Sequence, residues 1–297
     1  MATLGKMADI ERQALVILRP VEGRTDQKLA EQLASLELLT VEEFQPVARA
    51  LVRSFDGSCE FSLELPYSVA VARELGSRLQ QFSSGICNRD RHFHRALLSE
   101  CQDKFESLLQ VVDSPSTSKS EAALAKIRLT RIVTFIGHLY HVKCAPHGII
   151  HAILTDLIPS GESLSAEFRV LCSCALLELV GHAFAEVDAS YLVAFIGKLV
   201  ELTAKSSFGA PTRRLVEELR EISTTSWQPK RVLTVRAEMV ASHVKASCTN
   251  KGGEQVCAFN MMAGQGTRLG RSSQERNSEP LRRVDAHSSR RCLAPSR

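Results

Sequence analysis

Apolar residues recur at helical spacing along most of this 297-residue chain, and this regularity constrains the fold more than any other feature. Between Leu129 and Tyr140 the apolar positions follow the i, i+3, i+4, i+7 rule, so they share one face of a helix. The same arrangement returns in segments 150–158 and 192–200. No segment alternates apolar and polar residues for long, and the nearest approach, "CEFSLEL" at 59–65, is short. The sequence therefore predicts an all-α protein.

Short interruptions rich in Gly, Pro, Ser and Asp divide this pattern into separate helices. They lie at 55–58, 83–90, 113–120, 144–146, 159–163, 185–188 and 208–211. Start signals agree with the division, because Thr40 and Glu43 have the spacing of a capping box and Ser163 and Asp188 can act as N-caps. Successive helix pairs recur at roughly 40 residues, the period of HEAT-type repeats. We expect a HEAT-like α-solenoid of about five antiparallel helix pairs.

The periodic pattern begins near Thr25 and ends near Arg231, which suggests three parts. We expect an N-terminal extension at 1–24, a helical domain at 25–231 and a basic, mostly disordered tail at 232–297. The tail is rich in Gly, Ser and Arg and buries too little apolar area to offset the entropy of ordering it. Its arginines lack interleaved aromatic residues for base stacking, which favours an unselected extension over an RNA-gripping one.

Three residues suggest close packing inside the helical domain. Gly137 and Gly181 fall within helical patterns, where glycine costs up to about 1 kcal/mol. Close approach of a neighbouring helix is the simplest compensation. Trp227, the single tryptophan, is expected to cover the core of the last repeat.

Composition and targeting signals favour a soluble intracellular protein. The nine cysteines are irregularly spaced, and charged residues interrupt every apolar run near the N-terminus. We expect reduced thiols and no secretory signal. No uninterrupted apolar run approaches the roughly 18 to 20 residues that a membrane-spanning helix needs.

Segment 130–151, "TRIVTFIGHLYHVKCAPHGIIH", gathers four histidines and a cysteine and raises the question of a metal site. A step of 100° per residue places His138 and His141 on the polar face of their helix, while His147 and His151 lie beyond a turn. A zinc site needs four converging ligands, and neither a Cys-x-x-Cys nor a His-Glu-x-x-His spacing is present. The pattern favours solvated or capping histidines. Cys172 and Cys174 point about 200° apart on a helix and are interpreted as buried small side chains.

No segment carries the signature of a catalytic site. The sequence contains no Gly-x-Ser-x-Gly, no Gly-rich phosphate loop and no carboxylate pair in a plausible pocket. We therefore expect neither enzymatic activity nor a cofactor.

Segment 125–158, "AKIRLTRIVTFIGHLYHVKCAPHGIIHAILTDLI", resembles the middle domain of eukaryotic translation initiation factor 4 gamma. In that family a basic helix leads into a Phe-Ile-Gly motif, and a second helix opens near a histidine. Further segments resemble the other repeats in the family's order: 36–44, 67–72, 93–106, 179–184 and 226–231. Together they cover about residues 25–231.

The resemblance implies an adaptor of translation initiation that acts in the cytoplasm. Its helix pairs would bind the DEAD-box RNA helicase initiation factor 4A and contact mRNA weakly or indirectly. Matching positions suggest Leu36, Leu39 and Phe44 for helicase binding, although apolar residues at helical spacing are usually core. The basic positions before the Phe-Ile-Gly motif suggest an RNA-facing patch, although three charges over six residues more commonly form a solvated helix face. These positions are Lys126, Arg128 and Arg131.

The sequence also departs from the family pattern. The stretch between Phe44 and Tyr67 is short, so we expect a shortened second repeat. Pro46 would remove a backbone hydrogen bond inside a helix unless that helix starts late. No Tyr-x4-Leu-apolar peptide for the cap-binding protein is found, because Tyr140 and Tyr191 are followed by Ala145 and Ile196 where leucine is needed.

Other functions on the same fold stay open at this point. Similar middle domains occur in factors of nuclear cap binding and nonsense-mediated decay and in partners of the poly(A)-binding protein. A chain with this scaffold but no cap-binding peptide could also compete with a full-length factor.

Overall fold

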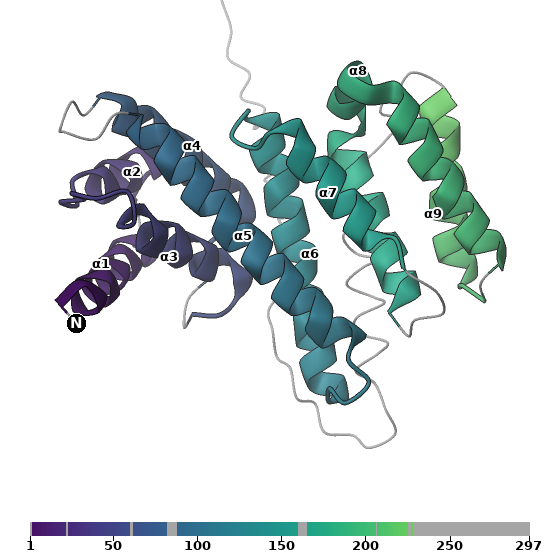
Figure 1. Ribbon diagram of the computed structural model, residues 1–297, viewed down its shortest axis with the longest axis horizontal. Coiled ribbons are helices and arrows are strands. Elements are labelled where there is room, and N and C mark those ends of the chain that lie inside the picture. The colour runs from purple at the N-terminus through teal and green to yellow at the C-terminus, as the bar shows by residue number, and fades with distance from the viewer. Residues whose placement is uncertain are drawn as a thin grey trace, which may run out of the picture. The chain divides into compact units, whose positions relative to one another are not determined.

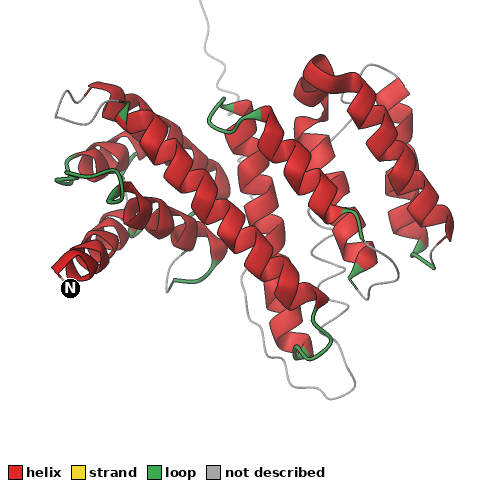
Figure 2. Ribbon diagram, in the orientation of Figure 1, coloured by secondary structure: helices red, strands yellow, loops and turns green. Residues whose placement is uncertain are grey.

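The computed structural model describes residues 2–21, 23–59, 62–81, 88–159, 165–205, 207–224 and 227. Within these ranges the secondary structure is helical, without strands (Figures 1 and 2). The helices are α1 (Ala2–Leu18), α2 (Asp26–Ala34), α3 (Phe44–Asp56), α4 (Leu65–Gln81), α5 (Arg89–Asp113), α6 (Lys119–His141), α7 (His147–Leu157), α8 (Ala166–Lys205) and α9 (Ala210–Thr224). The expected tail at 232–297 and the expected N-cap Ser163 lie outside the described residues.

The helices stack as consecutive pairs. The first members α1, α3 and α5 pack alongside one another, and the second members α2, α4 and α6 do the same. α6 then packs on α8, and α8 packs on both α7 and α9 (Figure 1). The pairs are α1–α2, α3–α4, α5–α6, α7 with the first half of α8, and the second half of α8 with α9. The predicted all-α, HEAT-like arrangement of about five pairs is confirmed.

The long helix α8 is two helices joined at Asp188, whose backbone leaves the helical region at φ −146° and ψ 73°. Its carboxylate accepts hydrogen bonds from the Ser190 hydroxyl at 2.9 Å and the Tyr191 backbone N–H at 3.0 Å. Asp188 is therefore the N-cap that the sequence predicts. By length and composition α8 is also apolar enough to cross a membrane, but 56% of that window is buried inside the protein, as in a core helix.

The core is a continuous apolar cluster in which phenylalanines from different pairs meet. The Phe55 ring of α3 lies 4.2 Å from the Phe135 ring of α6, centroid to centroid. Tilted aromatic pairs of this kind add to the stability that burial alone provides. The largest fully buried side chains are Phe44, Phe55, Phe93, Phe105, Phe135, Phe168, Phe184 and Phe195. The pairs are thus held together by a shared interior.

The two glycines predicted to allow close packing do so. A Cβ at Gly137 would lie 2.6 Å from Leu179 Cδ2 of α8. A Cβ at Gly181 would fall on the ring of Trp227, which is itself buried. The close packing expected at Gly181 and the covering role expected of Trp227 are therefore the same contact, in which the indole lies on the middle of α8.

The N-terminal pairs differ most from the expected layout. Helix α1 packs against α3, so the expected boundary at residue 24 does not coincide with a gap in the packing. The sequence predicts a shortened second repeat between Phe44 and Tyr67, but this stretch holds the 13-residue helix α3, and the shorter helix is α2 of the first pair, with 9 residues. Helix α3 begins at Phe44, so Pro46 stands in its first turn, where backbone N–H groups have no helical acceptor.

Candidate functional site

Residues 35–43, which connect α2 to α3, carry the most exposed large apolar side chain among the described residues. Leu39 is 70% exposed, and Val41 beside it is 41% exposed. Leu36 is partly buried against the core, and Phe44 is fully buried. Of the three residues that the resemblance suggests for helicase binding, the structure brings only Leu39 to the surface.

Glu43 holds this connection in one conformation. Its buried carboxylate accepts hydrogen bonds from the Lys6 ammonium at 2.6 Å, the Leu39 N–H at 2.6 Å and the Thr40 N–H at 3.4 Å. Burial alone would raise the pKa of Glu43, but these donors outweigh it and lower the pKa. The Glu43 half of the predicted capping box is therefore present, although α3 begins only after a run of tight turns.

The side chain of Arg89, at the start of α5, contacts the α2–α3 connection and the first residue of α3. Its guanidinium donates to the Leu38 carbonyl at 3.4 Å and lies 5.7 Å from the centre of the Phe44 ring. Sequence reasoning missed this residue, because its partners lie about fifty positions away in the chain. The exposed Leu39 thus rests on a connection fixed from both α1 and α5.

The three basic residues suggested for RNA contact all interact with the protein itself. Arg131 donates to the Phe55 carbonyl at 3.1 Å, and Arg128 donates to the Gly57 carbonyl at 3.2 Å. Lys126 Nζ lies 5.4 Å from the centre of the Phe168 ring of α8. The pKa of Arg131 is lowered by burial. None of the three is a freely solvated cation.

The contacts of Arg128 and Arg131 have a clear physical reason. Helix α3 ends at Asp56, and Gly57 follows in the left-handed conformation at φ 84°. The last carbonyls of a helix lack helical donors and form its negative pole. Two guanidinium groups from α6 supply both the donors and the positive charge. They fasten the second pair to the third.

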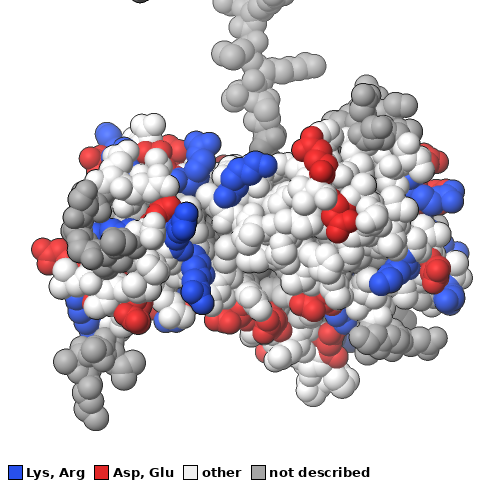
Figure 3. Space-filling view, turned by 45° about the horizontal axis from the view of Figure 1, so that its top comes forward, with Lys and Arg blue, Asp and Glu red and all other residues white. Residues whose placement is uncertain are grey.

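A strip of unpaired basic side chains lies elsewhere. Arg73 of α4, Arg91 and Arg95 of α5, and Lys143 after α6 are exposed and form no ion pair within the described part of the chain. Arg73 interacts electrostatically with Cys144, next to Lys143. Figure 3 shows Lys and Arg side chains gathered on this part of the molecule. We call these four residues the basic strip.

The register of α4 and α5 explains why the basic strip forms. Gln80 donates to the Asp90 carboxylate at 2.9 Å, and a Cβ at Gly76 would meet the His94 ring at 2.5 Å. The two helices therefore run antiparallel, with Arg73 one turn before Gly76 and Arg95 next to His94. The sequence periodicity predicts which helix carries each arginine. The antiparallel packing of α4 on α5 is what brings the arginines of the two helices to the same side of the protein.

Three of the four histidines of segment 130–151 contact α8. The His147 ring stacks on Phe184 at 4.0 Å, and the His151 ring lies 3.9 Å from that of Tyr191. His141 bonds the Leu179 carbonyl, while half-buried His138 has a pKa lowered by burial and by His141. Among the residues that the structure describes, no three His, Cys, Asp or Glu side chains are placed to hold a metal ion. Packing on aromatic rings is the observed role of His147 and His151.

Comparisons with known proteins cover the larger part of the helical region. A family model described as the MIF4G domain matches residues 59–223, more than half of the chain. Eukaryotic translation initiation factor 4 gamma of Dictyostelium discoideum is 25% identical over 151 residues, which are 46% of this chain and 11% of that protein. Eukaryotic translation initiation factor 4 gamma 2 of Homo sapiens and of Mus musculus are each 24% identical over 151 residues, or 47% of this chain and 17% of theirs. The alignments thus span a small part of these relatives. Leu39 precedes the segment 59–223 that the family model matches.

Proposed function

Because the chain belongs to the MIF4G domain family, we propose that it is a non-catalytic adaptor of translation initiation that binds the DEAD-box RNA helicase initiation factor 4A in the cytoplasm. The names of the similar proteins, which are forms of initiation factor 4 gamma, support this process over the nuclear and decay pathways. The resemblance of segment 125–158 to the middle domain of that factor adds the helicase as partner.

The observation that carries the proposal is the exposed Leu39 on a fixed connection. An apolar side chain held in water gains about 1.5–3 kcal/mol when a partner buries it completely. Because Glu43 already orders the connection, binding costs little additional conformational entropy. Val41 extends the apolar surface beside it. Leu36 and Phe44 then support this surface from the core rather than contact the partner.

The adaptor would act by holding the two lobes of the helicase in a productive orientation. A scaffold that prefers the closed helicase raises the affinity of the helicase for ATP and RNA. By linkage, the helicase then binds the scaffold more tightly when ATP and RNA are present. This role needs no catalytic group on the scaffold.

Contact with mRNA would occur through the basic strip. Its four cations are exposed and unpaired within the described residues, whereas Arg128 and Arg131 are engaged with α3. So few phosphate contacts predict weak binding that falls steeply as the salt concentration rises.

The proposal is tested by replacing Leu39 and Val41 together with alanine and measuring binding to initiation factor 4A by calorimetry, with RNA and a non-hydrolysable ATP analogue present. We expect about tenfold weaker binding, since partially buried contacts of this size contribute on the order of 1–2 kcal/mol. Val193→Ala, an exposed apolar residue of α8, is the matched control and should leave the affinity unchanged. Unaltered binding by the double variant, or no binding by the original chain, contradicts the proposal.

A further inference from the structure

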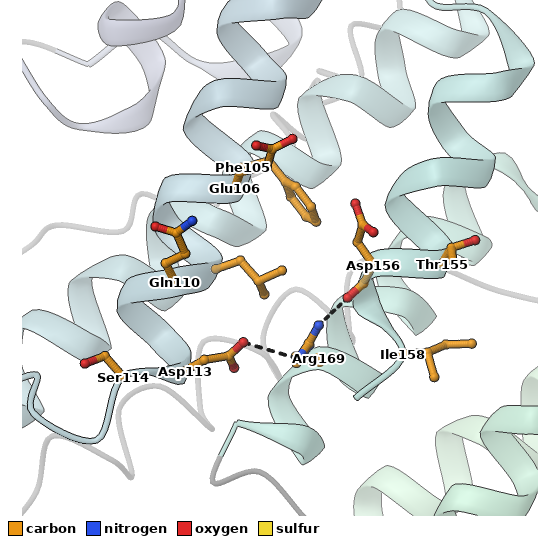
Figure 4. A pocket seen from close by; sticks show the side chains of 10 residues that line it. Phe105, Glu106, Gln110, Asp113, Ser114, Thr155, Asp156, Ile158 and Arg169 are labelled. Atoms are coloured by element: carbon orange, nitrogen blue, oxygen red, sulfur yellow. Dashed lines mark hydrogen bonds and ion pairs between the residues drawn. The ribbon is translucent and has the colours of Figure 1, made fainter. Parts of the chain in front are cut away.

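A groove of about 700 Å³ separates the C-terminal half of α5 from the end of α7 and the start of α8. Figure 4 shows α5 on one side and α7 on the other, with Arg169 of α8 at one end. The groove contains neither the α2–α3 connection nor any residue of the basic strip. It is therefore a second surface, independent of the proposed helicase contact.

Carboxylates dominate the charge of the groove. Glu106 and Asp113 come from α5 and Asp156 comes from α7, while Arg169 is the only basic residue among the lining side chains. Arg169 is committed to Asp113, whose carboxylate accepts its Nη1–H at 3.2 Å, and to the backbone carbonyl of Asp156. The carboxylates of Glu106 and Asp156 are left without an ion pair within the described ranges.

These two carboxylates influence each other across the groove. The pKa of Asp156 is raised, first by burial and then by the negative charge of Glu106, against the opposing effect of Arg169. Figure 4 shows them projecting from opposite sides of the groove. A cation placed between them would remove a repulsion that the folded chain otherwise retains.

The floor of the groove is apolar. Phe105 is buried, and Leu109 and Ile158 are partly buried against the core. Such a floor suits the methylene stem of a lysine or arginine, or an apolar neighbour in the same peptide. Gln110 stands exposed at the rim, where its side-chain amide can bond a peptide backbone. The Nε of Arg169, enclosed at the end of the groove, has no hydrogen-bond partner among the described residues.

We propose that this groove is a docking site for a partner protein, and that it takes a short peptide segment in which a lysine or arginine lies next to an apolar residue. The cation enters between Glu106 and Asp156, and the apolar residue covers Phe105, Leu109 and Ile158. The volume matches that of a short segment rather than of a whole domain face.

The charge of the groove argues against other classes of ligand. A nucleic acid would meet a net negative surface. The carboxylates and polar side chains of the groove do not form a cluster able to hold a metal ion in the part of the chain that is described. Complementarity of charge therefore selects a basic peptide, and the apolar floor selects one that is also amphipathic.

The test uses a fluorescein-labelled peptide, Gly-Ser-Leu-Arg-Leu-Arg-Leu-Ser-Gly, with the intact chain and fluorescence anisotropy as the readout. The reference peptide carries citrulline in place of both arginines, which keeps the shape and removes the charge. We expect the arginine peptide to bind about tenfold more tightly than the citrulline peptide, because each arginine can pair with a carboxylate that has no ion pair within the described ranges. Equal binding of the two peptides, or binding of neither, overturns the proposal.

Variants locate the contact. Glu106→Gln together with Asp156→Asn should lower the affinity for the arginine peptide about tenfold. Its midpoint of urea unfolding should stay level or rise, because a like-charge repulsion is removed. Glu186→Gln with Glu201→Gln changes the net charge equally at two α8 side chains that are 70% exposed, and it should leave the affinity unchanged. A double groove variant that binds as well as the original chain contradicts the assignment.

A charge exchange separates this groove from the proposed helicase contact. Glu106→Lys with Asp156→Lys should prefer a peptide with glutamate in place of arginine, while binding of initiation factor 4A should not change. Loss of helicase binding in this variant would show that the two surfaces are one. The Leu39→Ala, Val41→Ala variant should in turn bind the arginine peptide normally, so failure of either proposal is recognised separately.

Discussion

At the scale of single residues, basic side chains of α5 and α6 bind the end of α3. Arg128 and Arg131 bind the last carbonyls of α3, and Lys104 of α5 binds the buried Asp56 carboxylate at 3.0 Å in the same region. Asp56 also accepts from the Ser58 N–H at 2.7 Å. The end of α3 is thus a polar junction that three helices share. Loss of Arg128 or Arg131 would take a side-chain donor from a carbonyl at this helix end.

Replacing Arg131 with methionine keeps most of its length and removes its donors. We expect it to lower the free energy of unfolding by about 1–3 kcal/mol, since a buried carbonyl loses its partner. Arg95→Met on the exposed face of α5 is the control, and a change within about 0.5 kcal/mol is expected there. Urea unfolding measures both. Equal stability of the two variants would show that the Arg131 contacts do not support the fold.

Sequence reasoning identified these residues as basic and placed them on the correct helix. It assigned them to RNA because the carbonyls of Phe55 and Gly57, which lie more than seventy positions away, give no sequence signal of their own. The same limit applies to Arg89. Leu39, by contrast, was suggested from the resemblance and is exposed, while Phe44 in the same segment is in the core. In a connection without regular secondary structure, residue spacing does not indicate which side chains face the core and which face solvent.

At the scale of elements, the helices themselves were predictable because each carries an apolar stripe and recognisable ends. The break in α8 follows from the side chain of Asp188, which can cap a helix within three residues of itself. The α2–α3 connection was less predictable. Segment 36–44 resembles a family helix, yet its regular α-helix starts only at Phe44, after turns stabilised by Lys6 from a distant helix.

Two glycines of α8 should respond oppositely to alanine. Gly181→Ala would force the new Cβ into Trp227, so we expect the free energy of unfolding to fall by about 1–3 kcal/mol. A Cβ at Gly197 would meet no neighbouring atom within 4 Å, so Gly197→Ala should raise the free energy of unfolding by up to about 1 kcal/mol through helix propensity. Thermal and urea unfolding of both variants provide the comparison.

Trp227→Leu in the Gly181→Ala background serves as the second control. It removes the bulk that the new methyl group would meet, so part of the lost stability should return. If Gly181→Ala and Gly197→Ala change stability in the same direction, the close packing of Trp227 on α8 is not the reason for the glycine.

At the scale of the whole molecule, the order of the pairs and the fold class followed from the sequence because every repeat buries apolar residues against its neighbours. The start of the stacked region did not follow. Helix α1 contributes Ile10, Ala14 and Leu18 to the common core, and its Glu11 forms ion pairs with Arg49 and Arg53 of α3. Charged residues stand between these apolar positions, so the apolar face of α1 is not evident from the sequence. Segment 1–24 therefore reads as an extension when the sequence is considered alone.

Leu18→Ala should therefore destabilise the molecule by about 2–5 kcal/mol, as expected for a large side chain removed from a packed core. Val16→Ala on the same helix removes a side chain that is 60% exposed and should change the stability by less than about 0.5 kcal/mol. Urea unfolding followed by circular dichroism measures both. Similar values for the two variants would mean that α1 is not part of the folded stack.

Glu43 joins two distant parts of this architecture through one carboxylate. It receives the ammonium of Lys6 and orients the backbone around Leu39 at the same time. Cleavage of α1 after Lys6 would therefore leave Leu39 and Val41 present, yet it would remove a donor from the carboxylate that holds their backbone in place. The conformation of the surface around Leu39 therefore depends on a side chain that belongs to α1.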